Sequence, residues 1–131
     1  MHVPRVVLET MEPRQIVDTI LSVDKNIRYV GIVGPGPDHK VKASHMREGV
    51  KSLTPEQEDQ EFIRNIPETI LGLCRRVEDD LGKVRYSMLC FHRVTLMFFK
   101  MHGDIIVMSL EAGTFARPIF DRITHLLDLD R

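Results

Sequence analysis

The amino-acid sequence predicts a small α/β domain of the α+β type, with the element order α-β-β-α-β-β-β-α. Residues Lys83–Leu110 hold three apolar stretches separated by two short turns, His92-Arg93 and Met101–Gly103, which is the pattern of consecutive strands joined by hairpins. On both sides of this region apolar residues recur every three to four positions, the period of amphipathic helices. A length of 131 residues, 43% of them hydrophobic, fits one domain, 1–131, with a single core.

The first third of the chain predicts one helix and two strands. Residues 1–11 show no periodicity and are expected to form a flexible arm. A helix begins at Pro13, because proline suits the first helical position, and its pattern ends before Asn26. The strand Ile27–Val33 is apolar on both faces, as interior strands are, whereas Lys40–His45 has one polar, lysine-bearing face that is typical of an edge strand.

A long helix is predicted from Thr54 to Leu81. Thr54 can cap its first turn, and Gly82 provides a left-handed residue where the helix ends. Pro67 interrupts this segment. It removes one backbone donor and crowds the carbonyl four residues earlier, so that a kink or break is expected near Ile66. The apolar side chains of the helix fall in one stripe: Ile66, Ile70, Leu73, Cys74, Val77 and Leu81.

Three strands and a last helix complete the predicted order. The strands are Lys83–Phe91, Val94–Lys100 and Asp104–Leu110, and the second is apolar on both faces, so it is expected to be buried on both sides. The last helix follows Gly113 and has Pro118 within its first turn. Its apolar face consists of Phe115, Ile119, Phe120, Ile123, Leu126 and Leu127.

Charge and cysteine content restrict the class of protein. Lys and Arg number 18 and Asp and Glu 19, a net charge of −1, so no global attraction for nucleic acid or for an anionic membrane is expected. No apolar run approaches the ~20 residues that span a bilayer, and the first residues lack the pattern of a secretory signal. Cys74 and Cys90 lie among apolar neighbours and are expected to be reduced and buried, which indicates a cytoplasmic protein.

No stretch carries a recognisable chemistry. Two of the four residues in Gly34–Pro37 are prolines without an N–H, so this segment predicts a turn rather than a phosphate-binding loop. The six histidines contain no helical His-x-x-x-His pair and the cysteines no Cys-x-x-Cys, so no metal site is expected. No nucleophile and base have a recognisable spacing. The sequence therefore predicts no catalytic residue, no metal and no cofactor.

The strand Lys83–Phe91 is the informative anomaly. Strand alternation places Val84, Tyr86, Met88 and Cys90 toward the core, and the opposite face is apolar only at its end, at Leu89 and Phe91. If this strand lies at a sheet edge, these two side chains are exposed unless something covers them. Two covers remain open at this point: a partner's strand or helix, or the chain's own long helix.

This element order resembles the roadblock/LC7 fold, which is related to longin and profilin-like domains. The resemblance runs from Glu12 to Asp130 and depends on Val30–Val33 followed by a turn, on the paired strands Val94–Phe99 and Ile105–Leu110, and on the small-residue step before the last helix. The chain also looks like a group of small uncharacterised archaeal proteins. The resemblance implies a single five-stranded antiparallel sheet, with the long helix on one face and the two terminal helices on the other.

The resemblance also implies a function. Roadblock/LC7 proteins commonly dimerise through edge strands and long helices, and they act as non-catalytic scaffolds or as regulators of small Ras-like GTPases. The leading expectation is therefore a cytoplasmic, non-catalytic homodimer that binds a protein partner such as a small GTPase. The alternative is a PAS-like or profilin-like sensor of a small ligand, with some of the seven methionines lining a pocket. The expected dimer interface consists of Arg85, Ser87, Leu89, Phe91, Ile70, Cys74 and Val77.

Overall fold

The computed structural model describes residues 11–36, 38, 40–53 and 56–127. The arm predicted for residues 1–11 lies outside these ranges except for Met11, and so does the predicted cap at Thr54. The described elements are α1 Pro13–Leu21, β1 Ile27–Val33, β2 Val41–Met46, α2 Glu56–Cys74, the 3-10 turn η2 Arg75–Val77, α3 Glu78–Leu81, β3 Ser87–Cys90, β4 Val94–Met101, β5 Asp104–Glu111 and α4 Ala116–Leu126. The predicted element order is confirmed.

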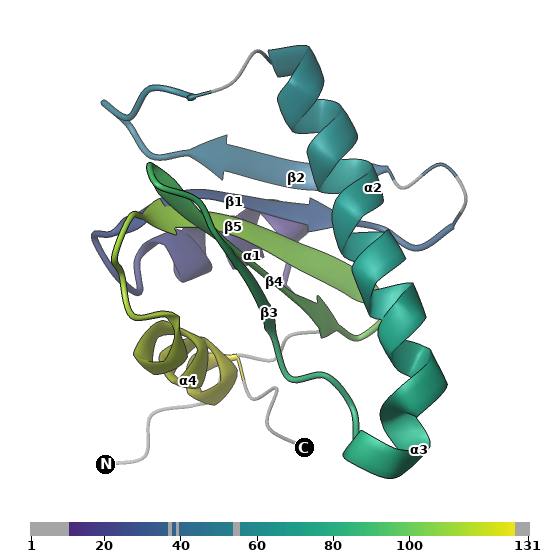
Figure 1. Cartoon of the computed structure of the whole chain (residues 1–131). Coiled ribbons are helices and arrows are strands. Elements are labelled where there is room, and N and C mark those ends of the chain that lie inside the picture. The colour runs from purple at the N-terminus through teal and green to yellow at the C-terminus, as the bar shows by residue number, and fades with distance from the viewer. Residues whose placement is uncertain (1–10, 37, 39, 54–55, 128–131) are drawn as a thin grey trace.

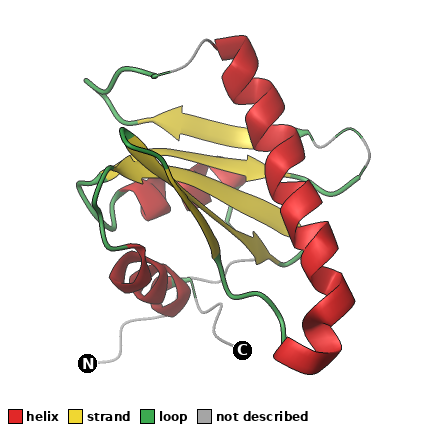
Figure 2. Cartoon of the chain, viewed as in Figure 1, coloured by secondary structure: helices red, strands yellow, loops and turns green. Residues whose placement is uncertain are grey.

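The five strands form one antiparallel sheet in the order β2-β1-β5-β4-β3. Figures 1 and 2 show α2 on one face of this sheet and α1 and α4 on the other. The implied layer arrangement is therefore confirmed. Because β2 and β3 end the order, each leaves one side without a neighbouring strand among the described residues.

The pairing of β4 with β5 fixes the centre of the sheet. It runs from Val94 opposite Glu111 to Met101 opposite Asp104. The connecting residues His102 and Gly103 both have positive φ, 47° and 90°, as both central residues of a type I′ hairpin turn do. This turn matches the twist of the strands, and their register shows no shift from end to end.

Two unequal hydrophobic cores lie on the two faces of the sheet. The larger core contains the apolar stripe of α1 and most of that of α4, with Phe120 packed edge-on against Phe99 of β4 at 5.1 Å between ring centroids. The smaller core, beneath α2, is formed by Val33, Leu71, Phe98, Ile105 and Val107. Two helices therefore cover one face of the sheet, whereas α2 is the helix that covers the other.

Arg47 joins three elements at one end of the sheet. Its Nε donates a hydrogen bond to the Ile27 carbonyl oxygen at 2.7 Å, and its Nη2 donates to the carbonyl oxygens of Leu21 and Asp24. The last carbonyls of a helix have no intrahelical partner and carry partial negative charge. The guanidinium therefore satisfies the end of α1 and holds it against the start of β1 and the end of β2.

The long helix differs from the prediction in two respects. It continues through Pro67 as an α-helix and changes to the 3-10 turn only at Arg75, so the predicted break near Ile66 is wrong. Pro67 is buried, one turn before Leu71, which is 4% exposed, and packing of this side on the sheet holds the helix together despite the missing donor. Gly82 has the predicted positive φ, 86°, but its ψ of 173° is extended rather than left-handed helical.

We predict that Arg47→Met will lower the free energy of unfolding by about 2–4 kcal/mol, because three carbonyls lose a charged hydrogen-bond donor while the aliphatic stem remains. Urea denaturation followed by circular dichroism measures this loss. The control is Arg64→Met, which changes an exposed side chain of α2 and should stay within about 0.5 kcal/mol of the unmodified protein. Equal effects of the two substitutions would contradict the structural role of Arg47.

We predict that Asp24 stabilises the fold at neutral pH and that acid removes this contribution. The backbone N–H of Asn26 and the Arg122 guanidinium, 2.8 Å away, hold the pKa of the Asp24 carboxyl below its ordinary value of 3.8. A lowered folded-state pKa stabilises above the unfolded-state pKa, and the benefit disappears as pH falls through the folded-state value. Asp24→Asn should therefore be less stable than the unmodified protein at pH 7, with the difference shrinking in denaturation measurements well below pH 3.8.

Candidate functional site

Most of the exposed large apolar side chains of the described residues lie on the long helix and its continuation or at the edge strand β3. Nine large hydrophobic side chains in the described ranges are exposed. Four of them lie on α2, η2 and α3, and two lie on or next to the edge strand β3. These six are Ile66, Leu73, Val77, Leu81, Met88 and Phe91. Such a concentration is more informative than single exposed hydrophobic residues, which are common on protein surfaces.

The stripe on α2 faces away from the sheet. Leu71 is buried on the sheet side, whereas Leu73 is 56% exposed and Val77 lies one turn beyond it on the same flank. The apolar stripe predicted from the sequence is thus largely an outer stripe, next to a buried one centred on Leu71. Figure 1 shows that the last turns of α2, together with α3, project beyond the edge of the sheet.

The edge strand β3 follows this helix end after a short loop. It pairs with β4 on one side only, from Ser87 opposite Phe98 to Cys90 opposite Thr95. Leu89 points to the face that α2 covers and packs, half-buried, against the smaller core. Phe91, just past the end of the strand, remains 51% exposed. The chain's own helix therefore covers Leu89 in part and leaves Phe91 open.

Solved structures with the same arrangement identify the fold. A roadblock/LC7 domain from Streptomyces avermitilis superposes with a TM-score of 0.64 at 13% identity, covering 91% of this chain and 94% of that one. The chain has the roadblock/LC7 fold. The gliding protein MglB from Thermus thermophilus gives a TM-score of 0.65 at 10% identity and 95% coverage of both chains. An MglB structure described as having a tetrameric arrangement gives 0.64 at 11% identity, covering 97% and 96%.

Neither a family model of protein sequences nor a curated protein sequence matches the chain. The chain therefore resembles these proteins in three-dimensional arrangement. In the sequence, only the order of the elements and the periodicity of their apolar residues indicated this fold. In this chain, the outer stripe of α2 and the β3 edge both carry exposed apolar side chains.

The structure separates the predicted interface residues into a group on or next to β3, a group on the long helix, and Arg85. Ser87 and Leu89 lie on β3 and Phe91 follows it. On the helix, Ile70 and Cys74 are half-buried, whereas Val77 in η2 is exposed in the outer stripe. Arg85 does not share their face. Its guanidinium lies over the Phe120 ring of α4 at 5.6 Å and 3.9 Å from the Asp121 carboxylate, on the opposite side of the sheet.

Arg85 departs from the predicted face because β3 is shorter than the sequence predicted. Strand alternation was expected over Lys83–Phe91, but only Ser87–Cys90 is a strand. Val84 and Tyr86, which were expected to share a face, pack against opposite cores. A period of two applies only where the backbone is extended and paired, so the residues before Ser87 follow another path.

The cysteines and titratable groups of the described residues can be compared with the prediction from the sequence. Both cysteines are free, as predicted, but neither is buried: Cys74 is half-buried, and Cys90 is exposed because its strand lies at the edge of the sheet. In the described part of the chain, no three His, Cys, Asp or Glu side chains lie close enough to hold a metal ion. No helix there is long and apolar enough to cross a membrane. The His45 ring, 3.1 Å from Asp18, and the neighbouring Arg14 lower the pKa of the Asp18 carboxyl, and this cluster links α1 to β2.

We predict that Cys90 reacts with the thiol reagent DTNB faster than Cys74 in dilute native protein, because its side chain is exposed on the edge strand and thiol reactivity requires access. Cys90→Ser should remove the fast phase of absorbance change, and Cys74→Ser should retain it. A fast phase that survives in Cys90→Ser would contradict the exposure of this strand.

Proposed function

We propose that this protein is a cytoplasmic, non-catalytic homodimer that regulates a protein partner, namely a small Ras-like GTPase. The single observation that carries the proposal is that the outer stripe of α2 and the unpaired edge at β3 both expose apolar side chains, in a chain with the roadblock/LC7 fold. The chemistry required is surface complementarity.

The edge strand supports self-association. An unpaired edge presents backbone N–H and C=O groups that a second strand can bind. If the β3 strands of two copies pair antiparallel about a twofold axis, each copy offers the same surface to the other, and the five-stranded sheets join into one. Satisfied backbone groups favour this arrangement, but an interface of useful size also needs apolar side chains.

The projecting end of α2 supplies these apolar side chains. A twofold axis through the paired β3 strands, perpendicular to the sheet, carries the end of α2 from one copy across the edge and onto the sheet of the other. Leu73 and Val77 of one copy then approach Phe91 of the second, and the reverse contact forms at the same time. Two exposed apolar surfaces that have no cover in one chain thus cover each other.

The proposed interface consists of Ser87, Leu89, Phe91, Ile70, Cys74 and Val77, as expected from the sequence, with Leu73 added. Arg85 remains a proposed member only at the rim, because its guanidinium turns to α4. The GTPase as partner is supported by the resemblance to roadblock/LC7 regulators and by the shared fold. No specific feature of the described residues favours the PAS-like or profilin-like sensor.

We predict that Leu89→Lys combined with Phe91→Lys gives a folded monomer, because two charges replace apolar side chains at the paired edge. Size-exclusion chromatography with light scattering measures the mass, and circular dichroism checks the fold. Because Leu89 is half-buried, the exposed pair Leu73→Lys and Val77→Lys provides a second test with less effect on the core. Phe115→Lys, which changes an exposed phenylalanine just before α4 and outside the proposed interface, is the control and should remain dimeric. Dimers in both double variants would refute the interface.

We predict that the native protein, used as bait in a lysate with either GDP or a non-hydrolysable GTP analogue, enriches a small GTPase in one nucleotide state. Mass spectrometry identifies the captured proteins. The monomeric double variant is the matched control, since it shows whether the partner requires the dimer. Recovery of the same proteins in both nucleotide states would contradict the regulator proposal.

A further inference from the structure

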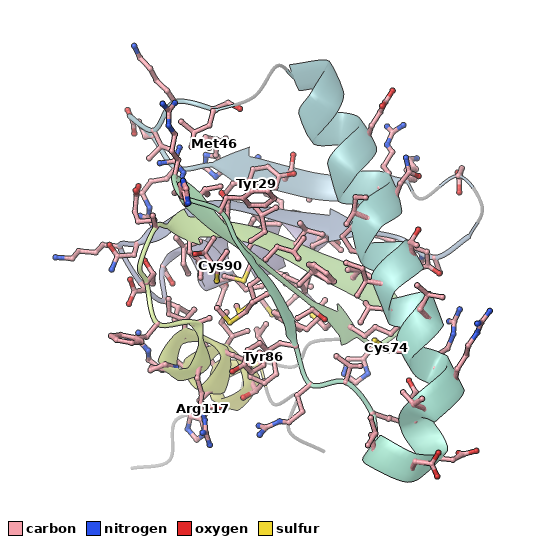
Figure 3. The ribbon with its side chains drawn as sticks, viewed as in Figure 1. Tyr29, Met46, Cys74, Tyr86, Cys90 and Arg117 are labelled. Atoms are coloured by element: carbon pink, nitrogen blue, oxygen red, sulfur yellow. The ribbon has the colours of Figure 1, made fainter. Side chains whose placement is uncertain are left out.

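A second uncovered surface lies on the face of the sheet opposite α2. Alternate side chains of β3, together with that of the residue before it, lie on this face. Tyr86 packs against Phe120 of α4 with 4.6 Å between the ring centroids, whereas Met88 is 39% exposed and Cys90 is also exposed. Figure 3 shows Tyr86 and Arg117 beside α4 and Cys90 further along β3.

On this face of the sheet, the exposed side chains begin at the edge strand β3. Met97, the partner of Met88 on β4, is fully buried, and Thr95, the partner of Cys90, is 3% exposed. The helical layer formed by α1 and α4 therefore covers the sheet as far as β4 and stops there. The result is a step: β3 forms its floor, and the flank of α4 forms its wall.

The wall of the step carries more positive than negative charge. Arg85 and Arg117 have side chains that are 61% and 77% exposed, and each lies 3.9 Å from the same carboxylate, that of Asp121. The guanidinium groups of Arg85 and Arg117 thus share the Asp121 carboxylate. The Arg85 guanidinium also lies 5.6 Å from the centre of the Phe120 ring, which holds it at the wall.

We propose that this step is a docking site for an amphipathic helix of a partner protein, with acidic side chains beside its apolar face. A helix parallel to α4 would continue the existing helical layer over β3 at the usual helix spacing of about 8–10 Å. Methionine supplies a floor that adapts to different apolar side chains. Acidic residues on the docked helix would pair with the guanidinium groups that share Asp121. The step consists of Tyr86, Met88 and Cys90 as floor and Arg85, Arg117 and Asp121 as wall.

The dimer proposed above would enlarge this site without being required for it. Pairing of two β3 strands brings the two steps together, so that the floor is continuous between the α4 helices of both copies. This two-sided form rests on the proposed function, whereas each single chain carries its own step. The step and the apolar dimer contact use opposite faces of β3 and share only Arg85, which stands at the rim of the proposed interface, so the oligomeric state is measured separately in each variant.

The test uses two synthetic helical peptides of about 18 residues, roughly five turns. Both carry leucines at the positions of one helix face, with glutamates flanking this face in the first peptide and lysines in the second. Fluorescence anisotropy of the labelled peptides measures binding, and the methyl signal of Met88, followed by NMR with labelled methionine, reports where binding occurs. The acidic peptide should bind the native protein more tightly than the basic one and should shift the Met88 signal.

Charge reversal provides the decisive comparison. Arg85→Glu combined with Arg117→Glu should weaken binding of the acidic peptide about tenfold and reverse the preference between the two peptides, because the attraction of two charge pairs is replaced by repulsion. Lys40→Glu, on an exposed residue outside the step, is the control and should leave the preference unchanged. Equal binding of both peptides, or equal effects of the two variants, would overturn the docking site. Light scattering on the same samples reports the dimer separately.

Discussion

The antiparallel pairing of β4 with β5 is the constraint on which the rest of the structure depends. Both strands are interior and hydrogen-bonded over their full length. Their side chains must therefore alternate between two apolar environments, as Phe98 and Phe99 do when they enter opposite cores. A sheet with two apolar faces needs helices on both sides, and the amphipathic segments before, between and after the strands provide them.

The helices cover the two faces of the sheet unequally, and this determines where apolar side chains remain exposed to solvent. Two helices lie on one face, and α2 crosses the other and projects past the sheet. β3 lies at the end of the sheet order, where neither layer covers it completely. Phe91 and Met88 are consequently exposed on opposite sides of one short strand. The proposed dimer contact and the proposed helix-docking step both follow from this incomplete cover.

The likeness to roadblock/LC7 structures concerns the path of the backbone, since identities of 10–13% leave few side chains in common. A fold can therefore persist while the surface chemistry changes, and a function must be argued from surface residues. In this chain the proposals depend on exposed hydrophobic side chains and on two ion pairs that share one carboxylate. Such a surface suits recognition of other proteins.

Local patterns alone determined the order of the elements, the bounds of β1, and the positions of the hairpins, because periodicity and turn residues act over short distances. The buried stripe of α1 was predictable for the same reason. Tertiary structure decided that Pro67 stays within the helix and that Leu71, rather than Leu73 or Val77, faces the sheet. It also decided that β3 is only four residues long, so that Arg85 turns to α4 and Cys90 is exposed. These outcomes depend on which surfaces distant segments bury against each other, and the spacing of residues along one segment does not contain that information.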